Sequence, residues 1–267
     1  MAGPGMMIGP DLGTLAIIVF ATALSGVASA ACAGLMLLLP AGARSRGLPY
    51  LVSFATGALI GAALLALLPH AIEGAGEGGA HGIGLALVAG LLLFFILEKL
   101  VLWRHCHGEH PDDPHEQAAA WLVLTGDALH NALDGVLIAA AFLTDIRLGI
   151  ATALAVAAHE IPQEVGDFAV LLHAGWSRAR ALWFNLGTSL AAVLGGIAAW
   201  FALSPVLGVL PYVLAVAAAS LLYVAVADLI PGLHRRVDAR SSLVQVTLMA
   251  LGIAIIALVE HSAHGPS

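Results

Sequence analysis

Eight long apolar segments dominate this sequence and limit the folds that it can adopt. Each contains about 20 or more mostly apolar residues, the length that an α-helix needs to cross about 30 Å of hydrocarbon. They run from about 12 to 39, 48 to 72, 82 to 103, 118 to 143, 148 to 173, 180 to 203, 206 to 230 and 242 to 261. We therefore predict an all-α membrane protein with eight transmembrane helices.

The composition agrees with this fold class. Of the 267 residues, 60% are hydrophobic and only 10% are charged, and the mean hydropathy is +0.97. Such values are typical of integral membrane proteins. The formal net charge of −7 and the lack of a basic stripe predict that the partners are the lipid bilayer and small ions, with no nucleic acid among them.

We expect residues 1–267 to form one membrane domain. Spans 1–3 cover about 12–103, a histidine-rich loop covers 104–117, spans 4–5 cover about 118–173 and spans 6–8 cover about 180–261. Histidine-rich tracts often bind metal, and a simple solvated acidic loop is the alternative. The sequence does not fix the oligomeric state, and a homodimer is one option.

The basic residues indicate the orientation of these spans. Nine of the ten lie in or beside the odd-numbered connections, and only Arg147 lies in an even-numbered one. Because cytoplasmic loops are enriched in Lys and Arg, the odd connections are expected to be cytoplasmic. Both termini are then extracytoplasmic, in a multi-pass protein of the cell membrane (the inner membrane if the source is bacterial). The nine are Arg44, Arg46, Lys99, Arg104, Arg178, Arg180, Arg235, Arg236 and Arg240.

A short sequence similarity links the second and seventh spans. The second ends in "LALLPH" and the seventh in "VADLIPGLH", and the two spans run in opposite directions. Similar sequences in two spans of opposite direction suggest inverted repeats on either side of a central pair of spans. The alternative is that proline simply ends many helices.

Ionisable residues are concentrated in spans four and five, although each charge inside a bilayer costs about 2.5–3.5 kcal/mol. On span four, polar residues follow the spacing i, i+3, i+4, i+7, which places them on one helix face. On span five, they surround Pro162, which we expect to open the backbone there. The span-four set is Asp127, His130, Asn131 and Asp134, and the span-five set is His159, Glu160, Gln163, Glu164 and Asp167.

Histidines, carboxylates and amides on two neighbouring helices form a set of metal ligands. Neutral imidazole together with oxygen ligands suits Zn²⁺, Fe²⁺, Mn²⁺ or a related ion such as Cd²⁺. The alternative is a hydrogen-bonded polar seam that joins the helices. The number of polar residues on these two spans favours the metal site.

The motifs at these positions resemble those of the ZIP (Zrt/Irt-like) family of divalent-metal transporters, and most closely its LIV-1 branch. The similar stretches are "HNALDG" on span four, "HEIPQEVGDFAVLL" on span five, "FNLGTSL" on span six and "YVAVADLIPGLH" on span seven. The resemblance implies a 3+2+3 arrangement of eight helices, an elevator-like movement and transport of Zn²⁺ or a similar cation toward the cytoplasm.

The resemblance also implies a binuclear metal site between spans four and five. His130, His159 and Gln163 match transport-site ligands, and Asn131, Asp134 and Glu160 match the second set. Ser189 falls where some members have a carboxylate. Together with Asp127 and Glu164, these residues make up the metal site that we predict.

This sequence departs from the LIV-1 pattern in two places. Gln163 replaces a histidine, and an amide oxygen is a weaker and harder ligand than imidazole, so the preference for zinc over manganese or iron is open. In span two, Ala62 and Ala66 stand where LIV-1 members often have Asp and His.

Two other functions fit parts of the sequence. "HEIPQ" is one residue short of the HExxH motif of zinc proteases, and "LDG" is found in intramembrane metalloproteases. Against a protease, Gln163 is not the second histidine, and "LDG" precedes the motif instead of following it. A proton-coupled carrier of an organic solute also uses buried His and carboxylates, but it does not need paired histidines on facing helices.

Overall fold

The computed structural model describes residues 11–106, 115–234 and 238–261, and every regular element in this part of the chain is helical. Asp11 caps the first helix by accepting hydrogen bonds from the Thr14 amide and hydroxyl groups, which lower the pKa of its carboxyl group. The elements are α1 (Leu12–Leu38), α2 (Ala41–Gly61), η1 (Ala62–Leu67), α3 (Leu68–Gly74), α4 (Ala80–Cys106), α5 (His115–Thr144), α6 (Ile146–His173), α7 (Arg178–Leu203), η2 (Ser204–Val209), α8 (Leu210–Tyr223), η3 (Val224–Leu229), α9 (Ile230–Leu233) and α10 (Ala239–His261).

The predicted apolar segments all lie on helices or on continuous runs of helical segments. Within the described residues, five stretches are long and apolar enough to cross a membrane: Leu12–Leu38, Gly42–Gly74, Ala80–Leu100, Arg178–Leu233 and Ala239–His261. The fourth of these contains two predicted spans, which the short 3₁₀ segment η2 joins. The all-helical membrane class is therefore confirmed, and the number of crossings stays a prediction.

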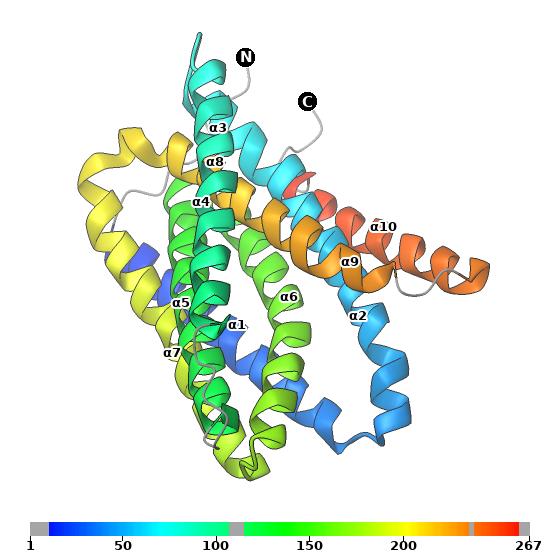
Figure 1. Cartoon of the computed structure of the whole chain (residues 1–267). Coiled ribbons are helices and arrows are strands. Elements are labelled where there is room, and N and C mark those ends of the chain that lie inside the picture. The colour runs from blue at the N-terminus through cyan, green and yellow to red at the C-terminus, as the bar shows by residue number, and fades with distance from the viewer. Residues whose placement is uncertain (1–10, 107–114, 235–237, 262–267) are drawn as a thin grey trace.

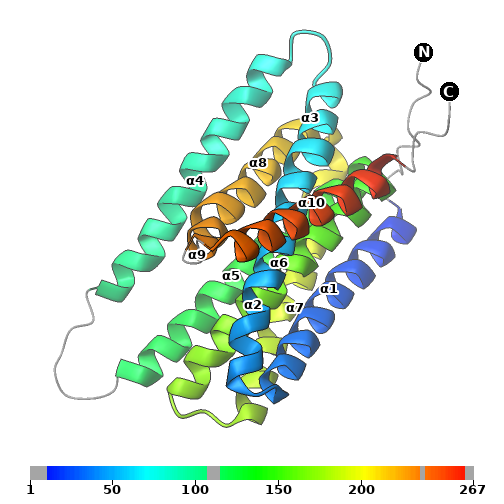
Figure 2. The ribbon, with the colours of Figure 1, turned by 90° about the vertical axis from the view of Figure 1, so that its right-hand side faces the viewer.

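The helices pack as two groups. One group contains α1, α5, α6 and α7, in which α5 packs on α6 and α7, and α1 packs on α6 and α7. The other contains α2, α3, α4, α8 and α10, in which α2 packs on α10, and α8 packs on α4 and α3. Figure 2 shows α4 at the edge of the molecule beside α8, and shows that α1 begins and α10 ends on the same side.

The two groups of helices pack against each other (Figure 1), and small apolar side chains fill the core between them. The contacts include α2 with α6 and α5 with α8. The buried residues of this core are rich in alanine, including Ala62 and Ala66 of η1, Ala151 and Ala155 of α6, and Ala218 of α8. Small side chains let the helices of the two groups approach each other closely.

The second and seventh predicted spans contain matching irregularities. In each, a six-residue π-helical segment, η1 or η3, precedes a short helix with proline at its second position, Pro69 or Pro231. A proline ring displaces the carbonyl group four residues earlier, here that of Leu65 or Ala227, and both of these lie inside the π segments. The segments also pack reciprocally, because η1 contacts α8 and η3 contacts α2.

Glycines allow two helix crossings to reach backbone contact. Where α5 crosses α7, a β-carbon on Gly135 would overlap the carbonyl group of Ala192, and one on Gly195 would overlap that of Ala132. Gly252 of α10 lies equally close to the backbone of α2. Close approach at small residues is a common way to pack helices in membranes, where lipid is as apolar as the side chains.

Two expectations about local structure differ from the structure. The backbone was expected to open at Pro162, but α6 continues through it from Ile146 to His173. One missing amide hydrogen removes a single helical bond, and the packed turns on both sides keep the helix intact. The predicted loop 104–117 is shorter, because α4 extends to Cys106 and α5 begins at His115. Its four histidines lie outside the part of the chain whose side chains the structure describes, as do Arg104, Arg235 and Arg236.

Candidate metal centre

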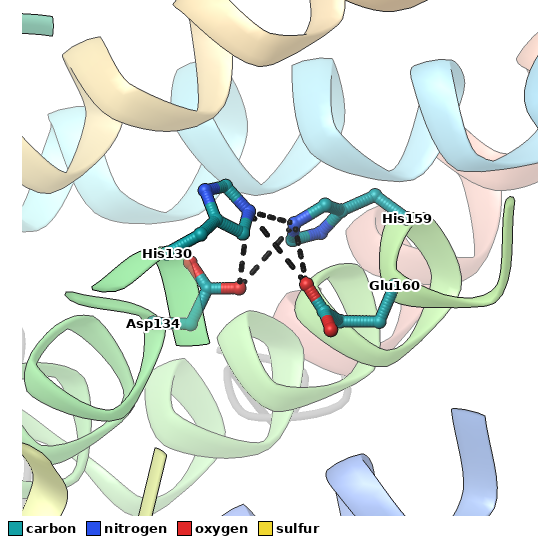
Figure 3. A group of neighbouring side chains, drawn as sticks. All are labelled: His130, Asp134, His159 and Glu160. Carbon is teal, nitrogen blue, oxygen red and sulfur yellow. Dashed lines mark hydrogen bonds and ion pairs between the residues drawn. The ribbon is translucent and has the colours of Figure 1, made fainter. Parts of the chain in front are cut away.

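Four predicted ligands converge between α5 and α6. His130 and Asp134 come from α5, and His159 and Glu160 come from α6; one nitrogen or oxygen atom of each lies within 4.8 Å of the other three. Figure 3 shows the two imidazole rings facing each other, with the two carboxylates on the same side below them. His130 and Asp134 are four residues apart, so the same face of α5 presents both toward α6.

The distances between these atoms match those expected around a tetrahedral ion. Ligands at about 2.0–2.2 Å from a zinc ion, arranged as a tetrahedron, lie about 3.3–3.6 Å from one another. Here the two histidine Nε2 atoms are 3.0 Å apart. His130 Nε2 lies 3.7 Å from Asp134 Oδ2 and 3.6 Å from Glu160 Oε1. His159 Nε2 lies 3.3 Å and 3.4 Å from the same two oxygens.

The second nitrogen of His159 fixes the direction in which its ring presents Nε2. His159 Nδ1 lies 3.3 Å from the carbonyl oxygen of Ala155 one turn earlier in α6. A ring that donates Nδ1–H to this carbonyl keeps the lone pair of Nε2 free for a metal, as metal-binding histidines generally do.

Three of the four ligands are buried, and the fourth, His130, is partly exposed. Asp134, His159 and Glu160 are at most 2% exposed, whereas the side chain of His130 is 23% exposed. Neither carboxylate oxygen of Glu160 has a hydrogen-bond donor among the described residues, and the same holds for Oδ2 of Asp134. Buried carboxylates without donors are costly unless a cation binds them, so this arrangement suits a divalent cation that arrives past His130.

The other predicted ligands lie beside this centre, in a hydrogen-bonded group. Asp127 Oδ1 accepts hydrogen bonds from the amide nitrogens of Asn131, at 2.9 Å, and Gln163, at 3.3 Å. Ser189 of α7 donates to Glu164 Oε1 at 3.4 Å. The amide nitrogens of Asn131 and Gln163 thus face Asp127. The predicted ligands on α5, α6 and α7 therefore divide into two neighbouring clusters, namely the four-ligand centre and this hydrogen-bonded group.

Two further polar contacts lie outside spans four and five. The hydroxyl group of Tyr223 on α8 donates a hydrogen bond to Glu98 on α4. His70 Nδ1 of α3 lies 3.6 Å from Glu260 Oε1 of α10. The sequence analysis did not find the role of Tyr223, because a lone tyrosine in an apolar span gives no signal for its partner.

Comparison with known proteins supports a metal-transport role. The family described as "ZIP Zinc transporter" matches residues 104–260. The chain is 35% identical to zinc transporter ZIP13 of Pongo abelii, over 84% of this chain and 70% of the relative. It is 29% identical to zinc transporter zipt-7.1 of Caenorhabditis briggsae, over 94% and 81%, and 33% identical to zinc transporter ZIP4 of Homo sapiens, over 78% and 42%.

These matches decide between the functional classes that the sequence left open. They span both helices of the metal centre, and the relatives are named as transporters. The resemblance seen in the motifs is confirmed, and the protease alternative is wrong because the family consists of transporters and not enzymes. The chain is a multi-pass membrane protein that belongs to the ZIP family of zinc transporters.

Proposed function

We propose that this chain carries Zn²⁺ or a similar divalent cation across the cell membrane toward the cytoplasm, holding the ion between α5 and α6. The observation that carries this proposal is the convergence of four ligand atoms from His130, Asp134, His159 and Glu160 at tetrahedral spacing. Two neutral imidazoles and two carboxylates sum to a charge of −2, which a divalent ion balances.

The ligand types also support a preference among ions. Two nitrogen ligands favour zinc and cadmium over manganese, whose sites are richer in oxygen. Asn131 and Gln163 flank the centre through their shared bonds to Asp127, and we assign them the role of positioning the α5 and α6 ligands. Zn²⁺ is therefore the proposed cargo, with Cd²⁺, Fe²⁺ and Mn²⁺ as weaker alternatives.

We further propose eight crossings arranged as 3+2+3 inverted repeats. The proposed symmetry exchanges α1 with α7, α2 with α8, α4 with α10 and α5 with α6. This symmetry requires that α10 packs on α2 as α4 packs on α8, and that α7 packs on α5 as α1 packs on α6. All four of these helix contacts occur. The matching π segments before Pro69 and Pro231 support the same relation. An even number of crossings places both termini on one side, and the distribution of basic residues favours the extracytoplasmic side.

The two groups of helices suggest how the ion moves. All four ligands belong to α5 and α6, within the group that also contains α1 and α7. The named hydrogen bonds and ion pairs each join helices of one group. We propose that this group slides as a unit along the alanine-rich interface and carries the ion with it, so that no ligand has to be released during the movement.

Metal uptake into proteoliposomes tests the proposal. Wild-type protein should take up Zn²⁺ with saturable kinetics, and Glu160→Ala should abolish this uptake while the protein still inserts. Glu73→Ala, which removes an exposed carboxylate at the end of α3, is the matched control and should retain uptake. Saturable Zn²⁺ uptake that Glu160→Ala leaves unchanged would refute the site. Uptake of an organic solute without any metal uptake would instead support the proton-coupled carrier.

A further inference from the structure

A groove between α5 and α7 opens on the outer surface of the molecule. Its volume is about 500 Å³, which lies within the range of sites that hold small molecules. A β-carbon on Gly187 would meet no atom within 4 Å, so this part of the groove is open space. Most of the lining is apolar or aromatic, and it includes Trp121, Leu124 and Ala128 of α5 and Trp183, Phe184 and Gly187 of α7. None of the residues that line the groove is one of the four metal ligands.

Stacked aromatic rings fix an arginine at one end of this groove. The rings of Trp121, Trp176 and Phe184 pack edge to face, with centroids 5.0, 5.3 and 5.5 Å apart. The guanidinium group of Arg180 lies 3.8 Å from the centroid of the Trp176 ring and 5.8 Å from that of Phe184. Cation–π contacts of this kind orient a guanidinium group. Because Trp121 and Phe184 also line the groove, Arg180 is held at its rim.

The charge of Arg180 is not balanced by an acid within the described part of the chain. Each ion pair found there involves a histidine, so neither Arg180 nor the nearby Arg178 is paired with a carboxylate of a described residue. Both arginines are exposed at the start of α7. A guanidinium group presents a planar fork of N–H donors, which matches two oxygens of a phosphate group. The rim is therefore suited to bind a phosphate.

The surroundings of the groove indicate which molecule supplies this phosphate. The chain is a multi-pass membrane protein, and the side chains of Trp121 and Trp183 are 48% and 70% exposed. Tryptophan is enriched where membrane proteins meet the lipid headgroups. The distribution of basic residues predicts that the start of α7 is cytoplasmic, and the cytoplasmic leaflet is the one that carries anionic lipids.

We propose that this groove binds an anionic phospholipid of the cytoplasmic leaflet, with the lipid phosphate on Arg180 and an acyl chain along the groove. A phosphate ion from solution would use the guanidinium group and leave the apolar lining uncovered. A lipid without net charge would cover the lining and leave the charge of Arg180 unbalanced. An anionic phospholipid satisfies both features. This goes beyond the proposed transport function, because the lipid is not the cargo and contacts other residues.

Quenching of tryptophan fluorescence by brominated lipids tests this proposal on the purified full-length chain. Phosphatidylcholine vesicles containing the protein receive a rising fraction of phosphatidylglycerol with brominated acyl chains, or of brominated phosphatidylcholine as the comparison. Bromine quenches at close range, and Trp121 and Trp183 line the groove. Tryptophans elsewhere meet both lipids equally. For the wild type, half-maximal quenching should need about fivefold less brominated phosphatidylglycerol than brominated phosphatidylcholine. An excess of inorganic phosphate should leave this difference unchanged.

Two variants disrupt the site in independent ways. Arg180→Gln removes the guanidinium group, whereas Gly187→Leu fills the groove and keeps Arg180. Each should bring the two half-maximal fractions to within about twofold of each other. Arg46→Gln is the matched control, because Arg46 is an exposed arginine of α2 on the same predicted side and does not line the groove, and it should keep the wild-type difference.

Three results would overturn the proposal. The first is equal quenching of the wild type by the two lipids, and the second is a difference that both groove variants retain. The third is a loss in Arg46→Gln as large as that in Arg180→Gln, which would show only diffuse attraction between basic residues and an anionic membrane. A difference that inorganic phosphate abolishes would likewise assign the rim to a free anion. Zinc uptake does not depend on any of these results, so the proposed transport function would stand.

Discussion

Replacing His159 with alanine should weaken zinc binding by about two orders of magnitude. His159 Nε2 lies within 3.0–3.4 Å of the ligand atoms of His130, Asp134 and Glu160, so its loss opens one corner of the tetrahedron. Zinc binding by four protein ligands provides about 10–16 kcal/mol, or about 2.5–4 kcal/mol for each ligand. At about 1.4 kcal/mol for each tenfold step, the Kd for Zn²⁺ should rise about 60- to 700-fold.

Calorimetric titration of the purified protein with Zn²⁺ measures this change, with Mg²⁺ present in excess to occupy sites that contain only oxygen ligands. His173→Ala is the matched control, because His173 lies on the same helix, is exposed and is not part of the centre. Its Kd should equal that of the wild type. A His159→Ala protein that binds Zn²⁺ within threefold of the wild type would show that His159 is not a ligand, and the assignment of the cargo site would fail.

Three other predictions follow from the packing and the ligand chemistry. Gly195→Ala should push α5 and α7 apart at a cost of about 1–3 kcal/mol and lower the unfolding temperature of the protein in detergent. Gly187→Ala is the control, because Gly187 faces open space on the same helix, and it should leave the unfolding temperature unchanged. Equal unfolding temperatures for the two variants would contradict the close crossing. Gln163→His should raise the ratio of Zn²⁺ to Mn²⁺ uptake in proteoliposomes, since it adds a nitrogen ligand beside the centre, and an unchanged ratio would remove Gln163 from the selectivity argument. Zinc affinity should fall as the pH is lowered from about 7.5 to about 5.5, because a metal binds only deprotonated ligands and must displace any protons on them; equal affinities at the two pH values would contradict this competition.

The spacing of polar residues was enough to predict that side chains of spans four and five converge. His130 and Asp134 share a face of a helix, and the adjacent pair His159 and Glu160 lies on the next apolar segment. In an apolar span, a histidine and a carboxylate are too costly to face lipid, so they must face each other. The helical class followed from the eight apolar segments, and the family followed from the motifs on spans four to seven.

The finer geometry was not accessible to this reasoning. The sequence could not divide the polar residues into the four-ligand centre and the hydrogen-bonded group beside it, because that division depends on how α7 lies against α5 and α6. Ser189, which the resemblance placed among the metal ligands, donates a hydrogen bond to Glu164. Pro162 signalled a break in α6 that surrounding packing prevents, whereas the π segments lie just before Pro69 and Pro231.

The charge of the centre explains why movement should require cargo. Two ionised carboxylates would give the centre a charge of −2, and a divalent ion would bring its net charge to zero. The interface along which the helices would move is lined by alanine and leucine side chains. Exposing two charges to such surroundings costs about 5–7 kcal/mol at about 2.5–3.5 kcal/mol each, which lowers the population of the moving state by more than about a thousandfold. If the group moves as proposed, the ion-loaded form should cross more readily than a form with both carboxylates ionised, and protons on Asp134 and Glu160 would permit the return step.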